Sequence, residues 1–130
     1  MRAAALTLAA AFAGVLAPVP ANACGVCDED KVAATYDHAV VRRAASQGRV
    51  MVFCEVRGPL DSRRLKTVAG RVKGLDATSL RTSAAPATLS FALDPTRQSA
   101  QAAVSALQAL APPGTQLTIV RMQGDATAPR

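Results

Sequence analysis

The spacing of apolar residues changes along the chain, and each change predicts a new element. Val32, Tyr36, Val40 and Ala44 recur every four residues, which predicts a helix over 28–48. Acidic residues at the start of this segment and arginines near its end favour the helix dipole. The pattern therefore indicates an N-terminal helix before any strand.

The spacing between apolar residues then shortens to two. Over 50–56, alternate positions are apolar or thiol side chains, which predicts a strand that places one set of residues on a single face. That set is Val50, Val52, Cys54 and Val56.

Two more helical faces follow, separated by strands. Asp61 or Ser62 is expected to cap a helix that ends at Gly74, and Asp94 followed by Pro95 is expected to start a helix that runs to about Leu110. Alternating segments predict three further strands, at 77–82, 88–93 and 115–122.

The predicted order after Gly48 is strand, helix, strand, strand, helix, strand. This is the split βαβ arrangement of ferredoxin-like domains. We therefore expect an α+β fold in which two helices cover one face of an antiparallel sheet, with one extra helix before it. The expected boundaries are 24–48 for the N-terminal segment and 49–123 for the ferredoxin-like domain, with a short flexible tail at 124–130.

The first 23 residues differ from the rest in composition. One cation, Arg2, is followed by an apolar Ala- and Leu-rich stretch, and small residues occupy the positions before Cys24. This is typical of a cleavable secretory signal, and the stretch is shorter than the roughly 20 residues of a membrane span. We expect an exported, periplasmic protein without a transmembrane span. Two alternatives are an uncleaved anchor and a lipoprotein that carries lipid on Cys24.

The chain is basic, with a formal net charge of +6, or +5 once the leader and Arg2 are removed. It has one Tyr, three Phe and no Trp, so it lacks the aromatic platforms on which single-stranded nucleic acids stack. Nucleic acid is therefore not an expected partner. The cations are expected to form a solvated surface that can face anionic lipid head groups.

Residues 50–122 resemble a heavy-metal-associated domain, the module of small copper chaperones and metal-pump tails. The resemblance rests on the element order and on two short runs, Gly74-Leu75 and Phe91-Ala92-Leu93-Asp94-Pro95. It implies the ferredoxin-like fold. The metal site of that family is a Met-x-Cys-x-x-Cys loop, and the matching positions here are Val56, Gly58 and Asp61. The chain therefore has the resemblance without the usual metal loop.

A different Cys-x-x-Cys motif, formed by Cys24 and Cys27, precedes this domain. Two thiolates can bind a soft ion such as Cu(I) or Zn(II), and cleavage before Cys24 would add its α-amino group as a ligand. Zn(II) would need further ligands from Cys54, water or a second chain, and a metal-bridged homodimer would supply them. His38 is a more distant candidate ligand.

The cysteines have other interpretations. Cys-x-x-Cys at a helix start is also the thioredoxin-type redox arrangement, and one of its cysteines could instead form a disulfide with Cys54. Cys54 could equally be a buried, inert thiol. We expect a non-enzymatic metal-binding or metal-handling protein. The alternative is a structural or protein-interaction module whose cysteines form a disulfide or a lipid anchor.

Overall fold

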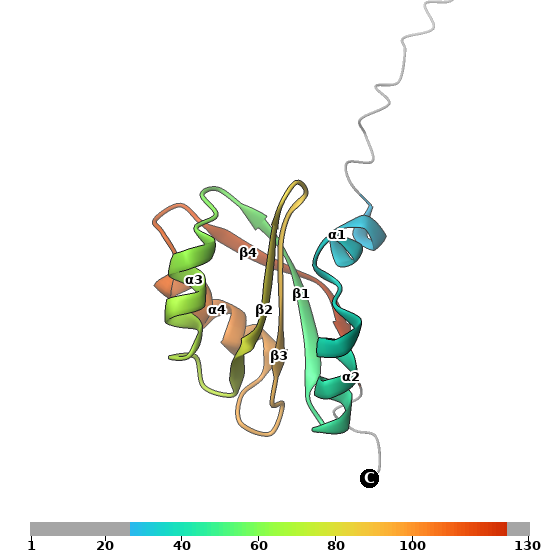
Figure 1. Cartoon of the computed structure of the whole chain (residues 1–130). Helices are drawn as coiled ribbons and strands as arrows, with labels where there is room; N and C mark the ends of the chain where they lie inside the picture. The colour runs from blue at the N-terminus through green and yellow to red at the C-terminus, as the bar shows by residue number, and fades with distance from the viewer. Residues whose placement is uncertain (1–26, 125–130) are drawn as a thin grey trace, which may run out of the picture.

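The computed structural model describes residues 27–124, so the predicted leader, Cys24 and residues 125–130 lie outside the described part. The elements follow one another as α1 (Asp28–Thr35), α2 (His38–Ser46), β1 (Val50–Arg57), α3 (Ser62–Ala69), β2 (Leu75–Ala84), β3 (Ala87–Leu93), α4 (Ala100–Leu110) and β4 (Gln116–Gln123) (Figure 1).

The four strands form one antiparallel sheet in the order β2-β3-β1-β4. The first strand of the chain, β1, therefore lies in the interior of the sheet, with β3 on one side and β4 on the other. Val52 lies opposite Phe91 of β3, and Cys54 lies opposite Ile119 of β4. The expected α+β class and antiparallel sheet are confirmed.

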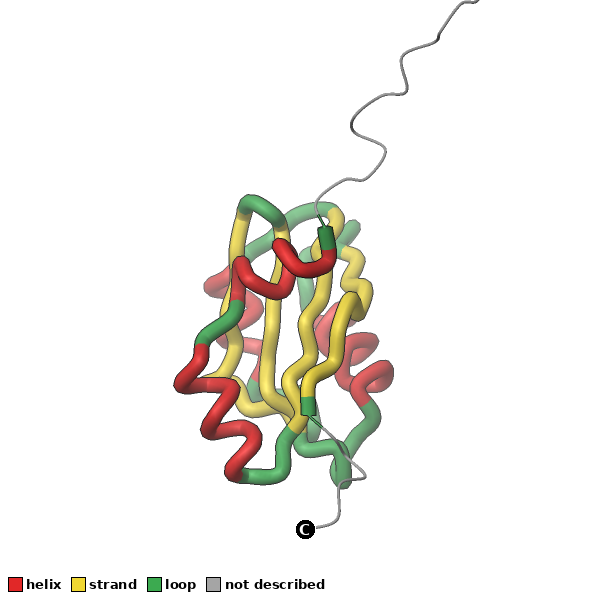
Figure 2. Tube along the Cα trace, turned by 90° about the vertical axis from the view of Figure 1, so that its right-hand side faces the viewer, coloured by secondary structure: helices red, strands yellow, loops and turns green. Residues whose placement is uncertain are grey.

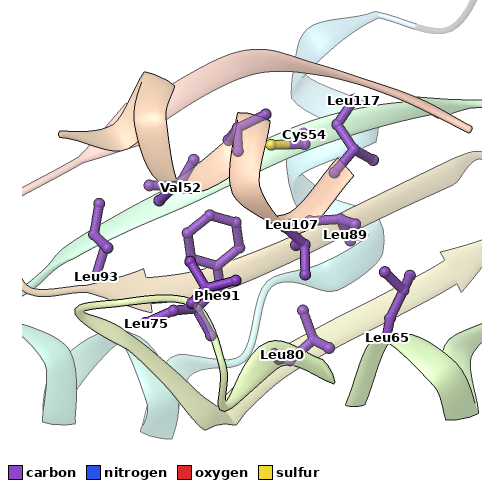
Figure 3. Close-up of a cluster of buried hydrophobic side chains, with 14 of the residues drawn as sticks. Val52, Cys54, Leu65, Leu75, Leu80, Leu89, Phe91, Leu93, Leu107 and Leu117 are labelled. Atoms are coloured by element: carbon purple, nitrogen blue, oxygen red, sulfur yellow. The ribbon is translucent and has the colours of Figure 1, made fainter. Parts of the chain in front are cut away.

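The main hydrophobic cluster lies between the sheet and the pair α3 and α4. Val52, Cys54 and Val56 of β1 all belong to it, as the strand alternation predicted. Leu65 of α3 and Leu107 of α4 pack onto the same face, and both are fully buried. Figure 3 shows the Cys54 sulfur among these apolar side chains.

The other face of the sheet is also covered, by α1 and α2 (Figure 2). The helices α3 and α4 share one face as expected, and the N-terminal segment, expected only to precede the sheet, covers the second face. Met51 and Phe53, the residues of β1 between the predicted inward positions, are only 2% and 1% exposed, and they pack with Val32 and Val40 in a second, smaller cluster. Both faces of β1 are apolar, so a helical layer on each side buries them.

The single helix expected over 28–48 is two helices. Backbone φ and ψ at Tyr36 are extended, and the Asp37 side chain accepts hydrogen bonds from the N–H groups of Ala39 and Val40 at 3.0 and 3.2 Å. Asp37 therefore caps a new helix rather than continuing the old one, because its carboxylate competes for backbone donors. The four-residue apolar repeat continues through the helix break at Asp37, so the apolar pattern alone does not indicate the break.

The ends of the other helices also differ from the prediction. Asp61 caps α3 as expected, but α3 ends at Ala69 rather than near Gly74. Asp94 does not start α4. Its carboxylate instead accepts bonds from the N–H and hydroxyl of Thr96, and Ser99 caps the helix by accepting from the N–H of Ala102. Both Asp94 and Ser99 suit an N-cap, and the pattern selected the wrong one.

Candidate functional site

Cys27 lies immediately before the first residue of α1 and is exposed. Its carbonyl oxygen accepts the first helical hydrogen bond, from the N–H of Lys31 at 3.1 Å. Its sulfur makes no capping hydrogen bond, and the thiol is free. The backbone of Cys27 is therefore fixed by the first turn of α1, while its thiol remains accessible to a ligand.

The acidic first turn of α1 is partly neutralised by protein cations. Asp28 pairs with Lys31 at 3.5 Å, and Lys31 also reaches Glu55 of β1 at 3.5 Å. Glu29 pairs with Arg121 of β4 at 2.9 Å. Two of the three carboxylates that follow Cys27 thus interact with protein cations, and the Lys31–Glu55 and Glu29–Arg121 pairs hold α1 against the sheet.

A β-bulge in β4 places Arg121 on the α1 side. The register shifts between Phe53 and Cys54, whose partners are Arg121 and Ile119, so β4 has one additional residue there, Val120. Residues directly opposite one another share a face of a sheet. Arg121 therefore projects on the same face as Phe53, toward α1, whereas regular alternation would place it with Ile119 on the other face.

Every strand of the sheet contributes a polar contact to the α1–α2 layer. Besides Glu55 and Arg121, Arg81 of β2 pairs with Asp37 at 3.2 Å. The hydroxyl of Ser90 in β3 donates to the carbonyl of Thr35 at 3.3 Å, in a buried setting. These contacts, with the smaller apolar cluster beneath them, fix the position of the helix that begins after Cys27.

Cys54 lies in the opposite layer. It is 0% exposed, it is free, and burial raises the pKa of its thiol to about 12. Its side chain packs on the α3–α4 face of the sheet, whereas α1 covers the other face. A Cys27–Cys54 disulfide is therefore not formed, and the structure does not bring these two predicted site residues together.

His38 is the first residue of α2 and is exposed. Within residues 27–124, no group of three or more His, Cys, Asp or Glu side chains is arranged to hold a metal ion. The described candidates Cys27, Cys54 and His38 therefore do not form a three-ligand site, and the other cysteine of the motif, Cys24, lies outside the described residues.

The loop that matches the family's metal site has a structural use. Gly58 has a φ of +85°, and a Cβ there would collide with the carbonyl oxygen of Gly114. The hydroxyl of Thr115 also donates to the carbonyl of Pro59 at 2.6 Å, and Asp61 caps α3. A cysteine at position 58 is sterically excluded by this close approach of two loops. The sequence shows the glycine but not the neighbouring loop.

Comparison with protein-family models, with curated proteins and with solved structures finds no match to this chain. Among the helices of residues 27–124, none has the length and apolar character needed to cross a bilayer.

Proposed function

We propose that this chain is an exported soft-metal-binding protein that uses Cys24 and Cys27 as thiolate ligands. The observation that carries the proposal is the position of Cys27, which is exposed at the start of α1. Polar contacts of α1 hold this helix to β1, β3 and β4, and Asp37, just after α1, pairs with Arg81 of β2. A ligand on such a helix is pre-organised, so less conformational entropy is lost when metal binds.

The ligand chemistry favours Cu(I). Two soft thiolates suit this ion in a near-linear arrangement, whereas tetrahedral Zn(II) needs two more ligands. If the leader is cleaved before Cys24, the free α-amino group adds a nitrogen donor. A second copy of the chain would bring two further thiolates, so a Zn(II)-bridged homodimer is the arrangement expected for that ion.

The proposal includes export. The apolar stretch before Cys24 and the small residues at its end support a signal peptide. The position of the cleavage site then decides whether Cys24 is the first residue of the mature protein. Export and metal binding are thus linked, because the same cleavage places the protein outside the cytosol and frees the N-terminal amine.

We also propose that residues 49–123 form a ferredoxin-like domain related to heavy-metal-associated domains. The element order β1-α3-β2-β3-α4-β4 and the sheet order β2-β3-β1-β4 support this assignment. The domain would serve here as a scaffold, since the loop at Gly58 cannot hold the family's cysteine. The thiols would instead be carried on the added α1–α2 layer.

Metal content after purification under reducing conditions tests the proposal. We expect about one equivalent of copper per chain after growth with copper, lost in both Cys24→Ser and Cys27→Ser. The matched control is Cys54→Ala, which alters the buried thiol and should retain the metal. If both serine variants retain as much copper as the unmodified protein, the proposal is wrong.

The intact mass of the same samples tests the alternative function. A diacylglycerol increment would identify Cys24 as a lipid anchor, which removes it as a metal ligand. The protein would then be an anchored interaction module. An intact mass equal to that of a chain that starts at Cys24 and carries no lipid supports the metal-binding proposal.

A further inference from the structure

The segment from the end of β1 to the start of β2 carries an unusual density of positive charge. All six of its cationic side chains are exposed, and none forms an ion pair with another residue of 27–124. They are Arg57, Arg63, Arg64, Lys66, Arg71 and Lys73. We call this surface, on and around α3, the α3 cationic face.

The net positive charge of the described residues comes from this face. Its one carboxylate, Asp61, accepts a hydrogen bond from the N–H of Arg64 in capping α3. The face therefore has a net charge of +5, the same as the whole of residues 27–124, because the remaining seven cations and seven carboxylates cancel. All five ion pairs of the described residues lie outside it.

We propose that the α3 cationic face docks the protein on an anionic lipid bilayer. Clusters of four to eight Lys and Arg residues bind such surfaces, and affinity rises with the number of cations. The choice of a bilayer as the occupant rests on the proposed export, which places the chain beside a membrane.

The composition of the face favours lipid over a protein partner. Protein interfaces depend on large apolar or aromatic anchors at their centre. The exposed large apolar residues of the described chain are Tyr36 and Met122, and neither lies on this face. Small or polar residues such as Thr67 and Gly70 lie between the cations. A bilayer needs no shaped anchor, because its head groups rearrange around fixed charges.

The docking geometry has a consequence for the thiols. The helices α3 and α1 lie on opposite faces of the sheet (Figure 1). A protein bound through α3 would therefore present Cys27 away from the lipid, toward water and toward any protein or metal complex that approaches from there.

Partitioning onto vesicles tests the docking proposal. Vesicles of phosphatidylcholine alone are compared with an equal mixture of phosphatidylcholine and phosphatidylglycerol, using the protein as recovered from expressing cells. We expect strong preference for the anionic vesicles at low salt and its loss at high salt. Arg63→Glu with Lys66→Glu should lower anionic partitioning by at least about 30-fold, at about fivefold per cation removed.

The matched control places the same charge change on the opposite layer. Arg42→Glu with Arg43→Glu alters two exposed cations of α2 that pair with no carboxylate in the part of the chain that the structure describes. We expect this variant to bind within about threefold of the unmodified protein. An equal loss in both double variants would show that overall charge alone drives binding, and would overturn the proposal.

Gly70 provides a second test that is independent of folding defects. It has a helical φ of −64°, and a Cβ there meets nothing within 4 Å. Gly70→Glu should lower anionic partitioning about fivefold, while Gly70→Gln should not. Equal partitioning of the unmodified protein onto the two vesicle types would overturn the proposal and leave an acidic protein surface as the occupant.

The metal proposal and the docking proposal can fail separately. The double variant Cys24→Ser with Cys27→Ser should bind anionic vesicles as the unmodified protein does. Loss of vesicle binding in that variant would contradict docking through α3, whatever its metal content.

Discussion

The two described cysteines differ in their surroundings. Cys54 is fully buried in the apolar cluster, whereas Cys27 is exposed at a helix start. Thiolate is the form that binds metal and reacts with electrophiles, and burial in an apolar cluster disfavours it. The fold therefore keeps one thiol in its neutral form and leaves the other accessible. Access determines which cysteine is the better candidate ligand.

The buried thiol predicts a loss of stability at high pH. Burial raises the pKa of Cys54 from 9.0 to about 12, so the unfolded chain loses this proton first. The stabilising effect is complete below pH 9, and the free energy of unfolding should then fall by about 1.4 kcal/mol per pH unit as the pH rises toward 12. Urea titrations of the unmodified protein and of Cys54→Ala at a series of pH values measure this decrease in the free energy of unfolding. The difference between the two proteins isolates Cys54, because their other groups titrate equally. If the unfolding free energies of the two proteins change in parallel above pH 9, the raised pKa of Cys54 is contradicted.

Two glycines predict opposite responses to a side chain. Gly58 combines a positive φ with the nearby carbonyl of Gly114, so Gly58→Cys should destabilise the fold by at least about 2 kcal/mol. Gly70 has a helical backbone and open space, so Gly70→Ala should be neutral or up to about 1 kcal/mol more stable. Chemical denaturation measures both. A Gly58→Cys variant as stable as Gly70→Ala would refute the steric explanation for the missing metal loop.

At the element scale, the sequence predicted what depends on local periodicity. The alternation around Val52 and Cys54 correctly placed one face of β1 in the main cluster, and Asp61 correctly marked the start of α3. The break at Asp37 was missed because an apolar repeat continues through it. The burial of Phe53 was missed for a different reason, since it depends on a helical layer from elsewhere in the chain.

The candidate site was predictable only in part. Cys27 was identified from its motif, but its attachment to the sheet depends on contacts between distant residues. The Glu29–Arg121 pair joins positions 92 residues apart and requires the bulge at Val120. No local pattern encodes this pair. The isolation of Cys54 from Cys27 likewise follows from the assignment of helices to opposite faces.

The α1–α2 layer should respond to loss of its own apolar contact. Val32 is the buried apolar residue of α1, and Val32→Ala should weaken α1 docking by about 2 kcal/mol, accelerating hydrogen exchange of α1 amides about 30-fold. Val68→Ala is the matched control, because Val68 in α3 is 8% exposed, close to the 7% of Val32, but packs in the main cluster on the other face of the sheet. Exchange that rises equally across α1 in both variants would show that α1 does not open separately.

At the scale of the whole molecule, the sheet separates two chemically different sides. One side carries α1, α2 and the accessible thiol, and its charged groups are largely paired. The other side carries α3, whose cations form no ion pair with any described residue. This division connects the two proposals, because one face would contact lipid while the other presents a metal ligand.

The paired carboxylates predict acid sensitivity of the whole fold. The pKa of Asp37 is lowered by the N–H of Val40 and by Arg81, although burial opposes this. Burial also opposes the shift at Asp76, but hydrogen bonds from Thr78 and the charge of Arg49 lower its pKa overall. A lowered pKa stabilises the fold above the ordinary value of 3.8 and loses this effect as the pH falls. The urea midpoint should therefore drop between pH 5 and pH 2, less steeply in Asp37→Asn. A constant midpoint would contradict this.

Titration of the fully reduced protein with Cu(I) in the presence of a coloured Cu(I) chelator shows whether Cys27 binds the metal. We expect the protein to remove one equivalent of Cu(I) from the chelator, and Cys54→Ala to do the same. The Cys27→Ser variant should leave the chelator loaded. Equal copper removal by Cys27→Ser and the unmodified protein would contradict the claim that the thiol at the start of α1 is a metal ligand.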